Sequence, residues 1–131
     1  MHPSDAIIPD GFQATYDQWH YSAAARAGDL LFISGVIGVD ADGKPPTDAE
    51  QQFIAAFEDI KLTLETAGGT LADIVELTSY HIDWTLNRDA FVKAKDKFLS
   101  PPWPAWTAIG IAELGIPGAL VEIRVVANLA D

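Results

Sequence analysis

Apolar residues recur along this chain with two periods, and the periods separate the predicted helices from the predicted strands. The clearest helical stripe lies within residues 48–67, where apolar positions repeat at helical spacing. Its members are Phe53, Ile54, Phe57, Ile60 and Leu64. Thr47 and Glu50 have the capping-box spacing at its start, and Gly68 and Gly69 follow its end. We therefore expect an amphipathic helix over residues 48–67.

A second, shorter stripe predicts another helix over residues 88–99. Its inward positions are Ala90, Phe91, Ala94, Phe98 and Leu99. Asn87 or Thr85 is the candidate N-cap of this helix. The prolines that follow in "SPPWP" cannot continue a helix, so the helix is expected to end there.

Runs rich in β-branched and aromatic residues predict five strands. They cover residues 16–25, 30–39, 74–82, 105–113 and 119–129. In the last strand, alternation places Val121, Ile123 and Val125 on one face and Glu122 and Arg124 on the other.

The predicted order is strand–strand–helix–strand–helix–strand–strand, which indicates an α+β fold in one domain over residues 1–131. Residues 1–13 are rich in proline and are expected to form an N-terminal arm. Both helices are expected on one face of a mixed sheet. The opposite face would then be apolar and uncovered, so the pattern also predicts an oligomer.

Charge and composition narrow the classes of function. The 19 acidic and 8 basic residues give a formal net charge of −11, which disfavours nucleic-acid binding. The chain has no cysteine, so disulfides, thiol nucleophiles and Cys-ligated metals are excluded. No signal peptide or apolar segment long enough to span a membrane is recognisable, and we expect a cytoplasmic protein without a membrane partner.

No motif predicts a metal or a cofactor. His81 and Asp83 form an H-x-D pair, but two ligands do not make a metal site, and we interpret them as a surface or interface pair. Ser34 lies outside any nucleophile-elbow motif. Gly68 and Gly69 follow a helix, whereas a phosphate-binding loop precedes one.

Three stretches, in this order and at this spacing, resemble the Rid family of enamine and imine deaminases, also called YjgF. They are "GDLLFISGVIGVDADGK", "LETAGGTLADIVELTSYHID" and "PAWTAIGIAELGIPGALVEIRVVA". The resemblance implies a chorismate-mutase-like fold. It also implies a homotrimer in which three sheets form a barrel with the helices outside. Small molecules would bind in clefts between the subunits.

The resemblance also implies an activity, the hydrolysis of reactive 2-imino acids to 2-keto acids and ammonia. It assigns the water-orienting carboxylate to Glu122 and a cleft-shaping tyrosine to Tyr21. It assigns substrate-binding backbone groups to the Ser34–Gly35 step and to Ala108.

One position departs from the family pattern. The family's arginine after Pro-Ala clamps the substrate carboxylate, and Trp106 stands there in this chain. An indole has one N–H and no charge, so it cannot replace a guanidinium. Trp106 could form an aromatic wall with Trp103 and Tyr21, or it could fill a subunit interface. Arg124 could supply the missing clamp, or it could pair with Glu122.

These observations leave two main hypotheses of function. The protein is an imine or enamine deaminase whose substrate does not depend on the usual clamp, or it is a non-catalytic binding module for an apolar or aromatic metabolite. The older family label, endoribonuclease, is less favoured because the acidic surface repels RNA.

Overall fold

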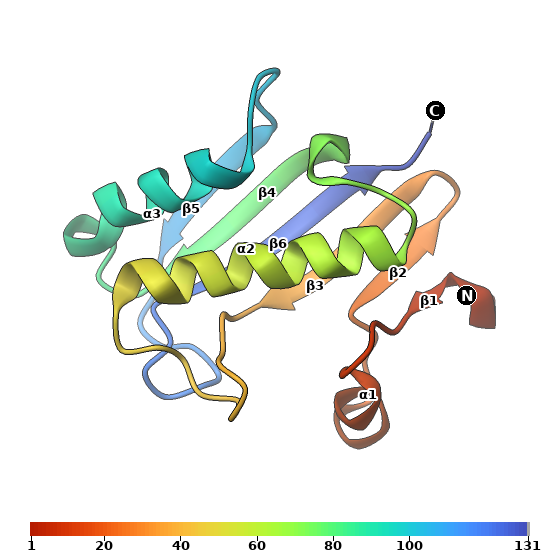
Figure 1. Cartoon of the computed structure of the whole chain (residues 1–131), viewed down its shortest axis with the longest axis horizontal. Helices are drawn as coiled ribbons and strands as arrows, with labels where there is room; N and C mark the ends of the chain where they lie inside the picture. The colour runs from red at the N-terminus through yellow and green to blue at the C-terminus, as the bar shows by residue number, and fades with distance from the viewer. Residues whose placement is uncertain (131) are drawn as a thin grey trace.

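Helices and strands segregate into two layers in the computed structural model, which describes residues 1–130 (Figure 1). Within these residues a single mixed sheet has the strand order β1-β2-β3-β6-β4-β5. The two long helices, α2 (Ala49–Thr66) and α3 (Trp84–Phe98), lie side by side across one face of the sheet. A short helix, α1 (Gln13–Trp19), lies outside this layer near the start of β2.

The strands are mostly short, and all pair in antiparallel fashion except β4 and β5, which are parallel. Their bounds are β1 (Ala6–Ile7), β2 (Ala24–Ala27), β3 (Leu30–Val36), β4 (Ile74–His81), β5 (Ala105–Gly110) and β6 (Val121–Asn128). Two 3-10 turns, Pro3–Asp5 and Leu71–Asp73, precede β1 and β4.

The core lies between the sheet and the two long helices. The central strand β6 contributes Val121, Ile123 and Val125, all buried, while Glu122 and Arg124 lie on the opposite face. The helices contribute the apolar stripe predicted from the sequence, including Phe53, Phe57 and Phe91, all fully buried. Removing this surface from water is the main favourable term in the fold.

The predicted α+β fold with two helices on one face is confirmed, but the N-terminal prediction is partly wrong. Residues 16–19 belong to α1 and not to a strand. The helix ends where His20 adopts the left-handed conformation, with φ of 60°, so the strand begins only at Ala24. The predicted arm is also not wholly irregular, because β1 within it pairs with β2.

The N-cap residues of both long helices differ from the predicted ones. Asp48 caps α2, since its Oδ2 accepts a hydrogen bond of 3.0 Å from the Gln51 backbone N–H. Thr47 lies one residue too early for this role. The helix α3 starts at Trp84, after Asp83 in the left-handed conformation, so it is four residues longer at its start than the apolar stripe indicated.

The second face of the sheet carries no helix (Figure 1). On β3 and β6, alternate side chains point away from the helices. Phe32 and Val126 are two of them, and they lie directly opposite each other in the ladder. Leu30, Phe32 and Ile109 are all exposed in the single chain. An apolar sheet face of this kind is usually covered in the assembled protein, which supports the expected oligomer.

Gly38, just after β3, offers the first test of this packing. A Cβ at this position would collide with the α2 backbone, at the Gln52 carbonyl and the Ala56 nitrogen. Because backbone atoms of a packed helix cannot move to relieve this clash, Gly38→Ala should lower the free energy of unfolding by about 1–3 kcal/mol. Gly115→Ala is the matched control, since no atom lies within 4 Å of its Cβ. Urea denaturation measures both, and equal stability of the two variants would contradict the prediction.

The uncovered sheet face gives a second test. Phe32→Asp should convert the oligomer into a smaller species, because a buried unpaired carboxylate costs several kcal/mol at an apolar interface. Leu86→Asp, at an exposed position of α3, should leave the assembly unchanged. Sedimentation velocity reads out the size of each species. An unchanged assembly in the Phe32→Asp protein would place the interface elsewhere.

Candidate functional site

A β-bulge in β3 is the local feature that shapes the site. Ile33 pairs with Val125 and Val36 pairs with Ile123, so Ser34 and Gly35 together oppose the single residue Arg124. A bulge bends its strand and redirects the neighbouring side chains. Here it opens the sheet beside β6, where Glu122 is located.

Glu122 approaches the backbone of the bulge closely. A Cβ on Gly35 would come within 2.5 Å of Glu122 Oε2 and 2.6 Å of its Cδ. The missing side chain at residue 35 is therefore what leaves room for the carboxylate. This gives a physical reason for glycine in the Ser34–Gly35 step, independent of any backbone conformation.

Ser34 holds the segment that carries Tyr21. Its Oγ donates a hydrogen bond of 2.8 Å to the Ser22 carbonyl, and its backbone N–H donates one of 2.9 Å to the Ala23 carbonyl. The Tyr21 ring meets Phe12 edge-on, with ring centroids 5.4 Å apart. Ser34 thus holds this segment through its side chain as well as its backbone. The sequence alone did not indicate a role for the side chain.

Tyr21, Ser34, Gly35 and Glu122 all line one cavity of about 740 Å³. Its other walls come from α1 and the segment before it, from α2 and from the loop before β6. They include the aromatic rings of Phe12 and Trp19, the aliphatic side chains of Val36, Val39, Leu62 and Ile116, and the carboxyl groups of Asp10 and Asp59. A cavity of this size and composition is typical of a small-molecule site.

The ionisable groups of this cavity influence one another. The pKa of the Tyr21 phenol is raised, first by burial and then by the negative charges of Glu122 and Asp59. The pKa of Asp59 is raised because neighbouring atoms displace water from its carboxyl group, although the residue remains exposed in the single chain. At neutral pH the phenol therefore stays protonated and can donate a hydrogen bond.

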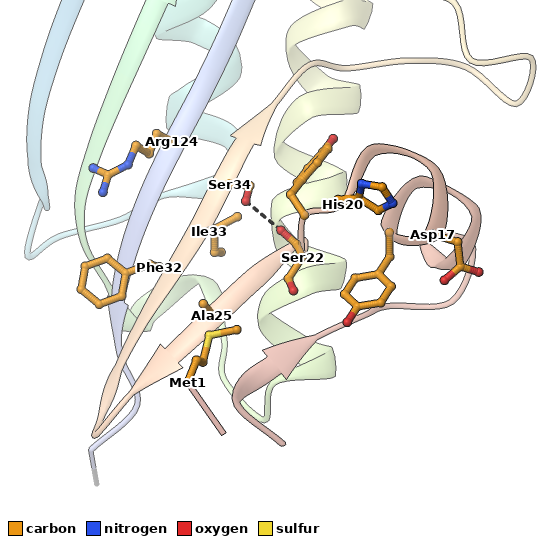
Figure 2. Close-up of a pocket in the computed structure, with 11 residues that line it drawn as sticks. Met1, Asp17, His20, Ser22, Ala25, Phe32, Ile33, Ser34 and Arg124 are labelled. Carbon is orange, nitrogen blue, oxygen red and sulfur yellow. Dashed lines mark hydrogen bonds between the residues drawn. The ribbon is translucent and has the colours of Figure 1, made fainter. Parts of the chain in front are cut away.

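Arg124 lines two neighbouring cavities, of about 640 and 370 Å³. Figure 2 shows the larger cavity. Arg124 projects from β6 on the same side as Phe32, and His20 and Asp17 lie on the other side of Ser34. The smaller cavity brings Arg124 together with Glu122 and Glu113. Among residues 1–130 no ion pair joins Arg124 to Glu122, so the predicted salt bridge is not formed.

Trp106 lies on the other face of the sheet, beneath α3. It pairs with Leu77 across the β4–β5 ladder and points to the helix side, as the buried Leu77 does. Its Nε1 donates a hydrogen bond of 2.9 Å to Ser79 Oγ, and its ring lies 6.0–6.1 Å from those of Trp84 and Phe91. Within one chain Trp106 is therefore a packing residue, remote from the Glu122 cavity.

Trp103 and Ala108 are also outside the three cavities described above. Trp103 is exposed and shares the Lys95 ammonium with Trp106, at 5.5 and 4.9 Å from the two rings. Ala108 lies on β5, at the edge of the sheet, opposite Ser79. The structure thus brings together five of the predicted site residues, Tyr21, Ser34, Gly35, Glu122 and Arg124, and leaves these three apart.

His81 is a core residue, and its interpretation as a surface pair with Asp83 is wrong. It is fully buried, shares a hydrogen bond of 2.7 Å with Ser79 Oγ, and packs its ring 4.4 Å from that of Trp84. Asp83 leaves the strand and begins α3. Burial lowers the pKa of His81 to about 4, so the imidazole is neutral at pH 7.

Two carboxyl-bearing residues of the Glu122 cavity, Asp10 and Asp59, were missed by sequence reasoning. Asp59 lies on the polar side of the helical stripe, where a charged residue is ordinarily only a solvated surface group. Asp10 lies in the proline-rich segment assigned to an irregular arm. Only the packing of α1 and α2 around the bulge reveals their shared position.

No helix among residues 1–130 is long and apolar enough to cross a membrane. Within the same part of the chain, no group of three or more His, Asp or Glu side chains is arranged to hold a metal ion.

Comparison with known proteins gives a consistent set of relatives. A family model described as endoribonuclease L-PSP matches residues 13–129. The RutC family protein YjgH of Escherichia coli is 40% identical over 127 residues, which cover 96% of this chain and 95% of that protein. A RutC family protein of Aquifex aeolicus is 34% identical over 109 residues, 82% of this chain and 86% of the relative.

Solved structures agree with this relationship. The structure of protein YjgH superposes with a TM-score of 0.87 at 39% identity, covering 96% of both chains. The Mycobacterium tuberculosis protein Rv2704, of the YjgF/YER057c/UK114 family, gives 0.81 at 27% identity, covering 94% of this chain and 98% of the other. RidA from an Antarctic Psychrobacter gives 0.78 at 28% identity, covering 98% and 97%.

The buried imidazole of His81 predicts a specific loss of stability in acid. Its folded pKa of about 4 lies below the ordinary value of 6.5, so the unfolded chain binds more protons between these two pH values. The stabilisation should be complete above pH 6.5 and fall by about 2 kcal/mol from pH 7 to pH 5. Urea denaturation at both pH values measures this loss in wild type and in His81→Gln.

The comparison isolates His81 because every other titrating group is common to the two proteins. The His81→Gln protein should lose less stability than wild type over the same pH interval, whatever its stability at pH 7. Equal losses would show that His81 is protonated as readily in the folded protein as in the unfolded chain.

Proposed function

Because the chain belongs to the endoribonuclease L-PSP family, whose members are also named YjgF and RutC, we propose that it is a deaminase that hydrolyses an imine or enamine. The observation that carries this proposal is the Glu122 carboxylate, held over Gly35 in a cavity that Tyr21 also lines. A carboxylate next to an apolar wall is suited to orient a water molecule and accept its proton.

The proposed chemistry divides the site between two kinds of group. Glu122 orients the attacking water, and the Tyr21 phenol, protonated at neutral pH, donates a hydrogen bond to the substrate or to the developing intermediate. Backbone groups of the bulge at Ser34 and Gly35 fix the position of the substrate relative to both. The apolar walls exclude bulk water, so that one water molecule attacks in a defined direction.

We further propose that the protein is a homotrimer and that its clefts are completed between subunits. The uncovered sheet face supports an assembly. The edge position of β5 gives Ala108 a backbone that is available to a neighbouring copy. Trp103 and Trp106, near the same edge, would contribute to a subunit boundary in such an assembly.

A non-catalytic binding module is the second candidate, and the position of Trp106 favours it. The residue at the carboxylate-clamp position has its only donor engaged by Ser79, so it cannot hold a substrate carboxylate. A ribonuclease is disfavoured, although the family is described as endoribonuclease L-PSP, because a net charge of −11 opposes RNA binding.

Two substitutions separate catalysis from binding. Glu122→Gln keeps the shape of the side chain but removes the proton acceptor, and should lower the rate of imine hydrolysis about 100-fold or more. Gly35→Ala should displace the flexible end of Glu122 and lower the rate about 10- to 100-fold with little loss of stability. Ammonia release from imines generated in situ measures both rates.

Gly110→Ala provides the control, because it adds the same methyl group outside the cavity, where the nearest atom, Trp84 Cβ, lies 4.0 Å away. A deaminase should retain most of its activity in this variant. If wild type fails to accelerate ammonia release above the uncatalysed rate for every imine tested, the binding module replaces the deaminase.

A further inference from the structure

The charged groups of the Glu122 cavity all have one sign. Among residues 1–130, three carboxyl-bearing residues line it, Asp10, Asp59 and Glu122, and no lysine, arginine or histidine does. They come from three separate parts of the chain, so they do not form one local acidic run. In a cavity from which part of the water is excluded, these charges repel an anion and attract a cation more strongly than they would in water.

The uncharged walls favour the same kind of ligand. The rings of Phe12, Trp19 and Tyr21 face the cavity from the N-terminal segment and α1. The faces of aromatic rings attract cations, and their area also accommodates an apolar skeleton. The pKa of Tyr21 is raised first by burial and then by the charges of Glu122 and Asp59, so both carboxylates act on the phenol.

Most basic residues of the chain form ion pairs and do not line this cavity. Five of the eight form ion pairs, and these pairs are Arg26–Asp29, Arg88–Asp89, Lys95–Asp96, and Lys93 and Lys97 with Glu50. Lys44 lies in the loop before α2, and Lys61 is exposed on α2. Arg124 lines the neighbouring cavities, so it is the one guanidinium that could bring an anion near Glu122.

We infer that the substrate of this site is a protonated imine derived from a primary amine, with an aromatic or apolar skeleton and no carboxylate next to the imine carbon. This inference rests on the proposed deaminase function and names its substrate class. Two observations within one chain carry it: the charged groups that line the cavity are all acidic and lie beside three aromatic rings, and Trp106 lies beneath α3 with its N–H bound to Ser79.

The chemistry balances with water as the only co-reactant. Water attacks the carbon of R–CH=NH2⁺ while the C=N electron pair moves to nitrogen, and Glu122 accepts the proton that the water loses. Glu122 then returns this proton to the nitrogen, the C–N bond breaks to release NH3, and the hydroxyl proton passes to this NH3 as the carbonyl forms. The products are R–CHO and NH4⁺. The carboxylates of the cavity favour the charged imine, which is the more electrophilic form.

The reaction that supplies such a substrate must be a two-electron oxidation of a primary amine, since that reaction forms the C=N bond. The product aldehyde would be removed by a further oxidation or reduction of the carbonyl. The deaminase would then act between two redox steps, shortening the lifetime of a reactive imine.

A matched pair of substrates tests the inference. Phenethylamine with a flavin amine oxidase, and phenylalanine with an amino-acid oxidase, give imines that differ by one carboxylate, each reaction including catalase. The lag before ammonia release reports the lifetime of the imine. We expect the full-length protein to accelerate hydrolysis of the amine-derived imine at least about tenfold more than that of the amino-acid imine.

Charge-neutral variants locate the source of this preference. Asp59→Asn should reduce the preference several-fold, whereas Glu58→Gln, which removes one charge from an exposed neighbour on the same helix, should leave it unchanged. Equal or faster hydrolysis of the amino-acid imine would overturn the inference while leaving the deaminase intact. If Arg124→Gln then abolished that activity, Arg124 would be the carboxylate clamp.

A binding measurement keeps the inference testable apart from catalysis. Calorimetry with phenethylammonium and with phenylacetate compares a cation and an anion on the same ring. Tighter binding of phenethylammonium, weakened in Asp59→Asn, supports the cation preference even if neither imine is hydrolysed, a result that would refute only the deaminase. Tighter binding of phenylacetate, or binding of neither probe, would overturn the inference.

Discussion

The site depends on the close approach of the Glu122 carboxylate to the backbone of Gly35. One extra residue in β3 creates the bulge, and the absence of a side chain at residue 35 leaves the space that the carboxylate occupies. Ser34 fixes the other side of the bulge through its bond to the Ser22 carbonyl, which positions Tyr21. A local irregularity of one strand thus determines where two functional groups lie.

The opposite face of the sheet packs against α3, and this packing accounts for a tryptophan at residue 106. Ser79 links the indole of Trp106 to the imidazole of His81 through two hydrogen bonds beneath α3. Such a buried polar cluster is stable only when its members find partners. His81 Nδ1 lacks one within residues 1–130, so the cluster is only partly satisfied, and burial, which lowers the pKa of His81, keeps the imidazole neutral. Trp106 thereby stabilises the attachment of α3 to the sheet instead of facing a ligand.

The features of these two faces together determine which ligand the proposed site favours. The cavity contains a carboxylate and a tyrosine that suit hydrolysis, its charges are all negative, and its walls combine aromatic and aliphatic side chains. Within one chain, a cavity lined by these carboxyl groups and no basic side chain is complementary to a cationic ligand. In the proposed deaminase, the chemical step would rest on Glu122, and the specificity would rest on Asp10, Asp59 and the aromatic rings.

The sequence by itself determined the α+β layers, because the helical stripe over residues 48–67 and the alternation around Glu122 are local periodicities. The resemblance to the Rid family assigned Tyr21, Ser34, Gly35 and Glu122 to one site, and all four line one cavity of the structure. Only the tertiary structure decided the face of Trp106, because an edge strand takes its orientation from its pairing with β4. Likewise, Asp10 and Asp59 join Glu122 only through packing of distant segments, which no local pattern records.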